Sequence, residues 1–188
     1  MSPNPTSKLF AALGITLVAL SSACRSTEGG STPSQHHRLS IAHGDPATRE
    51  KLMGFVTRLE GRWTTTTEGG ETAEIVFERT SAGHAVKETM FPGSPHEMVN
   101  MYTLDGNQLV MTHYCGAGNQ PRMRARRIEN GRMPFRFESV SDLNDEKGLY
   151  MGELELVRLD ENHVEERWRS FVDGKLNDTM VISLTRKP

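Results

Sequence analysis

Apolar and polar residues alternate with a period of two along most of the chain after residue 61, a pattern typical of β-strands with one buried face. Turn residues interrupt the alternation about every 8–12 residues, and pairs such as Asp105-Gly106 and Asn130-Gly131 are typical of hairpins. Consecutive hairpins leave exposed edges unless the sheet closes, so we predict an all-β, closed antiparallel up-and-down barrel. The pattern predicts about ten strands, at 62–68, 73–80, 84–91, 96–104, 107–114, 121–129, 132–140, 148–159, 163–172 and 175–186.

A helix is predicted before the first strand. Asp45 is a suitable N-cap, and Pro46 suits the first helical position. A short helix persists only when it packs against other structure, so we expect 46–60 to lie against one end of the barrel. Its apolar residues recur at intervals of three and four and form one stripe: Leu52, Phe55, Val56 and Leu59.

Residues 1–23 have the features of an export signal. Lys8 precedes an uncharged run over 9–20, which is shorter than the roughly 20 apolar residues of a membrane-spanning helix. The small residues before Cys24 resemble a bacterial lipobox, which implies lipidation of Cys24 and an anchor in the cell envelope. Because Arg25 follows Cys24 in place of an aspartate, the outer membrane is the expected membrane if the source has one. An ordinary secretory cut after Ala23 is the alternative.

Composition divides the rest of the chain into two parts. Residues 24–45 are polar and low in apolar residues, which predicts a flexible tether, whereas 46–188 forms one domain. The net charge is −2, with both signs interspersed, so nothing indicates a nucleic-acid partner. Of the 2 cysteines, lipidation removes Cys24 from pairing and leaves Cys115 as a buried or functional thiol.

The segment Gly61-Arg62-Trp63, between the helix and the first strand, resembles the Gly-x-Trp signature of lipocalin and calycin barrels. Further segments, at 91–98, 102–106, 112–115 and 118–123, look like a family of exported lipocalin-like bacterial proteins of unknown function. This resemblance implies a fold and no established activity. Haem-binding relatives carry further glycines where this chain has four threonines at 64–67, which argues against haem. His163 is then a surface histidine rather than an axial ligand.

The hairpin around Asp105-Gly106 carries the candidate site. Placing the turn on Asp105-Gly106 pairs Leu104 with Asn107, and placing it on Gly106-Asn107 shifts each partner by two without changing the faces. One face is bulky and mainly apolar with a few polar groups, as a ligand pocket requires, and we predict that it points inward. It carries His96, Met98, Asn100, Tyr102, Leu104, Leu109, Met111, His113 and Cys115. The alternative is a filled core whose polar groups satisfy one another.

We therefore predict an envelope-anchored protein that binds a small apolar or amphipathic molecule with one polar or anionic end. Asn100 and His113 are the expected hydrogen-bonding groups. The expected apolar contacts are Met98, Tyr102, Leu109 and Met111, and the expected rim residues are Asn119, Gln120 and Arg122.

Three other functions stay open. A zinc site would use His96, His113 and Cys115 with a further ligand. A thiol enzyme would pair Cys115 with a histidine oriented by Glu97, although Glu97 is predicted to face away from His96. The third is a structural or interaction lipoprotein without a ligand.

Overall fold

The computed structural model describes residues 42–188. The predicted export signal at 1–23, the lipidated Cys24 and most of the tether at 24–45 lie outside the described residues. Within 42–188, no helix is both long and apolar enough to cross a membrane.

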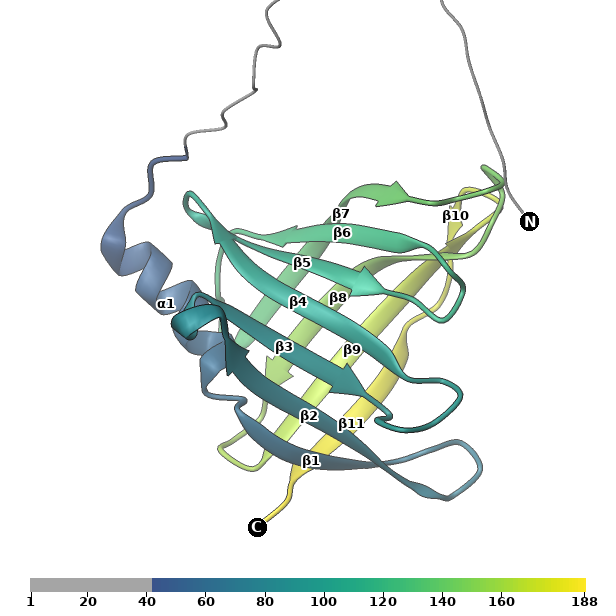
Figure 1. Cartoon of the computed structure of the whole chain (residues 1–188), viewed down its shortest axis with the longest axis horizontal. Helices are drawn as coiled ribbons and strands as arrows, with labels where there is room; N and C mark the ends of the chain where they lie inside the picture. Colours follow the sequence, from purple (N-terminus) through teal and green to yellow (C-terminus); the bar gives the residue numbers. More distant parts are fainter. Residues whose placement is uncertain (1–41) are drawn as a thin grey trace, which may run out of the picture. The chain divides into compact units, whose positions relative to one another are not determined.

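The described chain is a closed antiparallel barrel of 10 strands with one helix before it, which confirms the predicted fold class (Figure 1). Neighbours in the sequence are neighbours in the barrel from β1 to β9, and β11 closes the ring between β9 and β1. The strands are β1 (Gly61–Thr66), β2 (Thr72–Thr80), β3 (Ala85–Met90), β4 (Met98–Asp105), β5 (Gln108–Tyr114), β6 (Gln120–Ala125), β7 (Arg132–Ser141), β8 (Tyr150–Arg158), β9 (His163–Val172) and β11 (Met180–Arg186). The two-residue strand β10 (Lys175–Leu176) pairs with the C-terminal end of β9. The short 3-10 helix η1 (Ser81–Gly83) connects β2 to β3.

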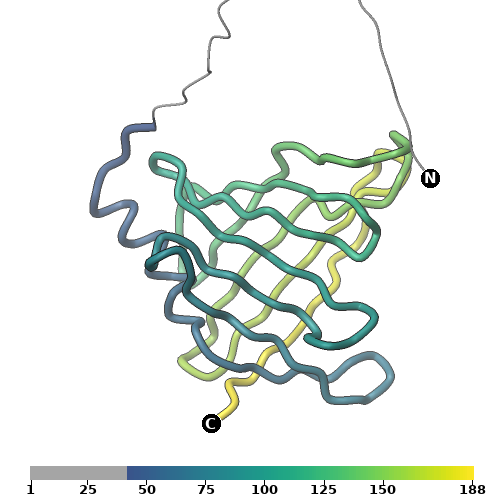
Figure 2. Tube along the Cα trace, viewed as in Figure 1, coloured from purple at the N-terminus to yellow at the C-terminus, as the bar shows by residue number. Residues whose placement is uncertain are grey.

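The helix α1 (Pro46–Thr57) lies at one end of the barrel, as predicted (Figure 2). The Asp45 side chain accepts a hydrogen bond from Thr48 N at 2.8 Å and caps the first turn. Two further contacts join the start of the helix to the β4–β5 turn: Asp45 N donates to Asn107 Oδ1 at 2.6 Å, and Arg49 Nη1 donates to Gly106 O at 2.8 Å. The opposite end of the barrel is formed by the β1–β2, β3–β4 and β5–β6 loops.

Trp63 lies at the end of the barrel next to α1 and has no exposed surface. Its Nε1 donates to Leu59 O at 2.7 Å, and the Arg186 guanidinium carbon lies 4.2 Å from the centroid of its ring. Gly61 has φ +126°, a backbone conformation that favours glycine, and an added Cβ would also lie close to Arg186 Nη1, at 3.1 Å. The Gly-x-Trp segment therefore joins the helix, the first strand and the last strand at one point.

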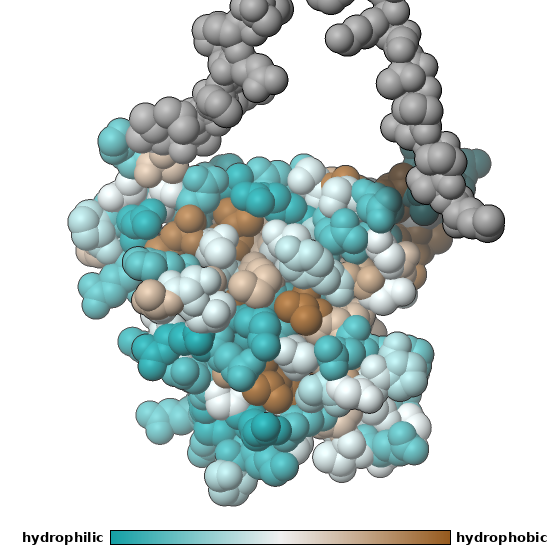
Figure 3. All heavy atoms as spheres, in the orientation of Figure 1, coloured by the Kyte–Doolittle hydropathy of each residue, from teal (hydrophilic) through white to brown (hydrophobic). Residues whose placement is uncertain are grey.

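The face of the molecule seen in Figure 3 is mainly hydrophilic, with scattered hydrophobic residues. The arginines of β6 lie on the outer surface of the barrel: Arg122 pairs with Glu138 at 2.9 Å, and Arg124 pairs with Asp105 and Glu138, each at 2.6 Å. The structure thus places these arginines on the outside of the barrel, where their charges are already balanced.

Gly152 lies at a bulge in β8, where an added Cβ would collide with the Phe171 ring. That ring stacks on Tyr150 with a centroid distance of 5.2 Å. Gly152→Ala is therefore expected to lower the free energy of unfolding by about 1–3 kcal/mol, measured by urea denaturation, because Phe171 must leave its stack. The double variant Gly152→Ala/Phe171→Leu should recover part of this loss. An unchanged stability of Gly152→Ala would contradict the close packing.

Candidate functional site

A network of buried polar side chains, here called the polar chain, crosses the barrel interior from β3, β4 and β5 to β9. Because inward residues alternate along each strand, β3 contributes Glu88, β4 contributes Asn100 and Tyr102, and β5 contributes His113. Cross-strand pairing places Asn100 opposite both Glu88 and His113. From the other side of the ring, β9 contributes Glu166 and Trp168.

Glu88 is the centre of the polar chain. Its Oε2 accepts hydrogen bonds from Asn100 Nδ2 at 2.8 Å and from the Tyr102 hydroxyl at 2.6 Å. Glu88 and Glu166 also hydrogen-bond to each other, and the Oε1 atom of each has no donor among the other described residues. Trp168 Nε1 donates to Glu166 Oε2 at 3.0 Å.

Burial and hydrogen bonding together determine which of the two carboxyl groups keeps a proton. Burial raises the pKa of both, and the charge of Glu88 raises the pKa of Glu166 further. The hydrogen bonds from Tyr102 and Asn100 oppose the rise at Glu88. Glu166 therefore has the higher pKa of the two and is the member that keeps a proton and donates it to Glu88, which avoids two adjacent buried charges.

His113 connects this polar chain to an open space. Its Nδ1 lies 2.6 Å from Asn100 Oδ1, and its ring centroid lies 5.1 Å from that of Trp168. The side chain is 2% exposed, and burial lowers its pKa to about 4, so the imidazole is neutral at neutral pH.

The open space is a cavity of about 350 Å³ at the barrel end away from the helix. His113 and Trp168 form part of its wall, Cys115 lies in its lining as a half-buried free thiol, and Glu68 contributes from the β1–β2 loop. Most of the lining is apolar and rich in methionine: Met90, Phe91, Met98, Met151, Met180 and Ile182. The cavity has the mainly apolar wall and few polar groups that a small-molecule site requires.

Only part of the predicted site lines this cavity. Met98 and His113 do, whereas Asn100, Tyr102, Leu109 and Met111 are buried deeper and are absent from the described lining. Asn100 and Tyr102 hydrogen-bond to Glu88, so their polar groups are satisfied inside the protein. The inward direction of this face is confirmed, and a ligand contact by each residue stays a prediction.

The predicted rim residues do not reach the described cavity. Asn119 is buried and its Nδ2 donates to Leu149 O at 2.8 Å, which connects the β5–β6 and β7–β8 loops. Gln120 accepts a hydrogen bond from Ser141 Oγ at 2.9 Å. Arg122 points outward from β6 because its neighbours Pro121 and Met123 are the inward residues of that strand.

Of the residues in the zinc and thiol-enzyme alternatives, His113 and Cys115 share the cavity lining, whereas His96 and Glu97 lie apart from them. β4 begins at Met98, so His96 lies exposed in the loop before it rather than on the inward face, a correction to the predicted strand. Glu97 Oε2 accepts from Gly93 N at 2.6 Å within the same loop. Within residues 42–188, no group of three or more His, Cys, Asp or Glu residues is arranged to hold a metal ion. His163 is exposed and its Nδ1 contacts Asp160 Oδ2 at 2.9 Å.

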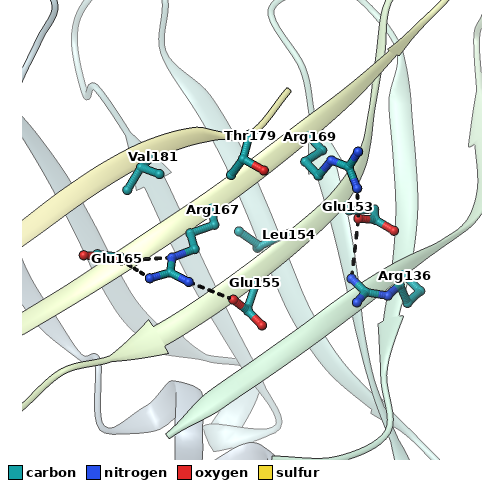
Figure 4. A pocket seen from close by; sticks show the side chains of 9 residues that line it. All are labelled: Arg136, Glu153, Leu154, Glu155, Glu165, Arg167, Arg169, Thr179 and Val181. Atoms are coloured by element: carbon teal, nitrogen blue, oxygen red, sulfur yellow. Dashed lines mark hydrogen bonds and ion pairs between the residues drawn. The ribbon is translucent and has the colours of Figure 1, made fainter. Parts of the chain in front are cut away.

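A larger hollow, of about 580 Å³, lies on the outer surface over β8 and β9 (Figure 4). Its arginines already pair with its glutamates: Arg167 with Glu165 at 2.7 Å and with Glu155 at 3.4 Å, and Arg169 with Glu153 at 3.3 Å. Charged side chains that already pair with one another on an open surface contribute little binding energy to a ligand. The smaller interior cavity is therefore the better candidate site.

Sequence reasoning missed Glu88 and Glu166, although the signal was present. Each occupies an inward position of its strand, between Val86 and Met90 in one case and between Val164 and Trp168 in the other. A glutamate at an inward position of an otherwise apolar face predicts a buried carboxyl group.

Comparison of the chain with models of known protein families gives no match, and no curated protein matches it at a significant level. The closed barrel is consistent with the calycin-like fold that the Gly-x-Trp segment implied, and no family is identified. The function of the site must therefore be argued from its own geometry.

Proposed function

We propose that the protein is an envelope-anchored binding protein that holds a small, largely apolar molecule in the cavity at the open end of the barrel. The observation that carries the proposal is the methionine-rich apolar lining with His113 in its wall. A volume of about 350 Å³ is near the lower end of known ligand sites, which begin at roughly 300 Å³. With about 30 Å³ for each water-sized group, the ligand has on the order of ten non-hydrogen atoms.

The lining also suits a ligand whose shape is irregular. Methionine side chains have several rotatable bonds and a polarisable sulfur, so they adapt to different apolar surfaces. Met98 and Met180 approach the cavity from different strands, β4 and β11, and Trp168 adds a rigid aromatic surface from β9. These features favour apolar contact over a network of polar contacts.

The test is native mass spectrometry of protein purified from the envelope of its own host. We expect the wild type to retain a small molecule and Cys115→Phe to lose it, because the larger side chain fills the cavity next to His113. Tyr114→Phe is the matched control, since Tyr114 is 49% exposed and lies outside the described lining. Protein that is empty in each preparation and binds no apolar probe would contradict the proposal.

The same preparation tests the envelope anchor. Lipidation predicts that the mature chain begins at a Cys24 carrying acyl groups, which the mass of the N-terminal peptide reports. An unmodified Cys24 would remove the anchor from the proposal and leave the binding function to be judged separately.

A further inference from the structure

The orientation of the Asn100 amide is determined by Glu88. Oε2 of Glu88 accepts from both the Tyr102 hydroxyl and Asn100 Nδ2, so the amide nitrogen of Asn100 points to the carboxylate. The amide oxygen then faces His113, at 2.6 Å from Nδ1. A flipped amide would place two acceptors, Oδ1 and Oε2, against each other.

This amide orientation determines the tautomer of His113. An amide oxygen can only accept a hydrogen bond, so Nδ1 of His113 carries the proton and donates to Asn100. In the neutral ring, Nε2 then holds a lone pair and can only accept. No described residue hydrogen-bonds to Nε2, although the side chain is almost completely buried and lines the cavity.

We infer that the ligand carries a hydrogen-bond donor, an uncharged O–H or N–H group, that donates to Nε2 of His113 while its apolar body lies against the methionines. The inference rests on the proposed function and adds the chemical class of the ligand. Nε2 is not among the completely buried polar atoms that lack a partner, so it opens on the cavity. An apolar ligand that covers Nε2 without a donor leaves this acceptor unsatisfied, which is costly, whereas a donor on the ligand satisfies it.

The charges around the cavity argue against an anionic ligand, which the sequence had left open. No lysine or arginine occurs in the described lining, and its charged residue is Glu68. Behind His113 lie the two acidic side chains Glu88 and Glu166, and no lysine or arginine side chain is buried beside them among the described residues. Burial also keeps the pKa of His113 low, so its ring does not supply a positive charge at neutral pH.

Three probes of similar size separate these possibilities at pH 7: 1-octanol, its isomer 1-methoxyheptane, and octanoate. Affinity is measured by isothermal titration calorimetry on the purified mature protein. We expect octanol to bind about tenfold more tightly than methoxyheptane, because the ether leaves Nε2 without a donor, and octanoate to bind more weakly than octanol. In His113→Phe, the preference of octanol over the ether should disappear.

The tautomer supplies a second readout that needs no variant. In protein labelled with ¹⁵N at histidine, we expect the His113 signal at pH 7 to report a proton on Nδ1 and none on Nε2. Equal binding of octanol and methoxyheptane, tightest binding of octanoate, or a proton on Nε2 would overturn the inference while leaving an apolar binding function intact. Binding of none of the three probes would overturn both the inference and the proposed function.

Discussion

Replacing Trp63 with alanine is expected to lower the free energy of unfolding by about 3–5 kcal/mol, the usual cost of removing a large buried aromatic side chain. The indole has no exposed surface and contacts three parts of the chain. It hydrogen-bonds to Leu59 O, stacks under the Arg186 guanidinium and is part of the continuous core. Its removal leaves a cavity and an unpaired carbonyl oxygen, and Arg186 loses its aromatic contact.

Urea denaturation followed by far-ultraviolet circular dichroism measures this loss without depending on tryptophan fluorescence. The matched control is Thr64→Ala, at the adjacent half-buried position that faces outward from β1, which should change the stability by about 0.5 kcal/mol or less. If Trp63→Ala behaves like Thr64→Ala, the Gly-x-Trp segment has no structural role in this barrel.

The hairpin shows how far the sequence alone can specify the register. Alternation predicted correctly that Asn100, Tyr102 and His113 share the inward face, because a strand has a period of two in any register. It did not decide between the two possible turns. The structure pairs Asp105 with Gln108 and so places the turn on Gly106-Asn107. Asn107 accepts a hydrogen bond from Asp45 N, a contact with the helix start that local turn chemistry does not include.

The last predicted strand, 175–186, divides for a similar reason. Asn177 N donates to Ser170 O at 2.8 Å and Arg169 Nε donates to Asn177 O at 3.1 Å, so both backbone groups of Asn177 bind β9 before the strand resumes at Met180. These contacts join residues on the two sides of a turn. They form only after the strands have paired, so the local sequence does not predict the break in the strand.

The candidate site was harder to predict than the fold because facing inward does not mean facing a ligand. Sequence alternation placed Asn100 and Tyr102 inside the barrel but could not show that Glu88 uses their donors. The reach of a side chain across the barrel, as from Glu166 to Glu88, depends on strand tilt and stagger, which alternation does not encode. Position along the barrel axis determines which inward residues line the cavity. His113 lines it, and Met111, two residues earlier on the same face, does not.

Glu88→Leu should also destabilise the protein strongly, by about 3–5 kcal/mol, because it removes the central acceptor of a buried hydrogen-bonded network. Asn100 Nδ2 and the Tyr102 hydroxyl lose their acceptor, and Glu166 is left buried beside an aliphatic side chain. Each buried polar group without a partner costs about 1–3 kcal/mol. Leucine is similar to glutamate in size, so urea denaturation reports mainly the loss of polar contacts.

Glu166→Gln is the matched variant that keeps the network. A glutamine amide can donate to Glu88 as the protonated carboxyl group does, and its oxygen can accept from Trp168 Nε1. We therefore expect Glu166→Gln to be far more stable than Glu88→Leu at pH 7. If both variants lose the same stability, the shared proton does not organise the interior.

The proton on Glu166 also predicts that the free energy of unfolding depends on pH. The pKa of Glu166 is raised above the ordinary value of 4.5, so between these two pKa values the folded protein binds more protons than the unfolded chain. Stability contributed by Glu166 is complete below pH 4.5 and is lost as pH rises towards the folded pKa, at up to about 1.4 kcal/mol per pH unit. His113 acts in the opposite direction between its folded pKa of about 4 and 6.5, because burial lowers its pKa.

The difference in unfolding free energy between wild type and Glu166→Gln removes the contribution of His113 and the contribution that burial gives to Glu88, because both proteins contain these residues. We expect this difference, wild type minus variant, to decrease steadily as pH is raised from 5 to 8, when unfolding is measured in urea at each pH. Glutamine does not titrate, so the variant lacks the slope that the Glu166 proton gives to the wild type. Parallel profiles for the two proteins would show that Glu166 holds no proton between the carboxyl groups, and the assignment of the shared proton to Glu166 would then be wrong.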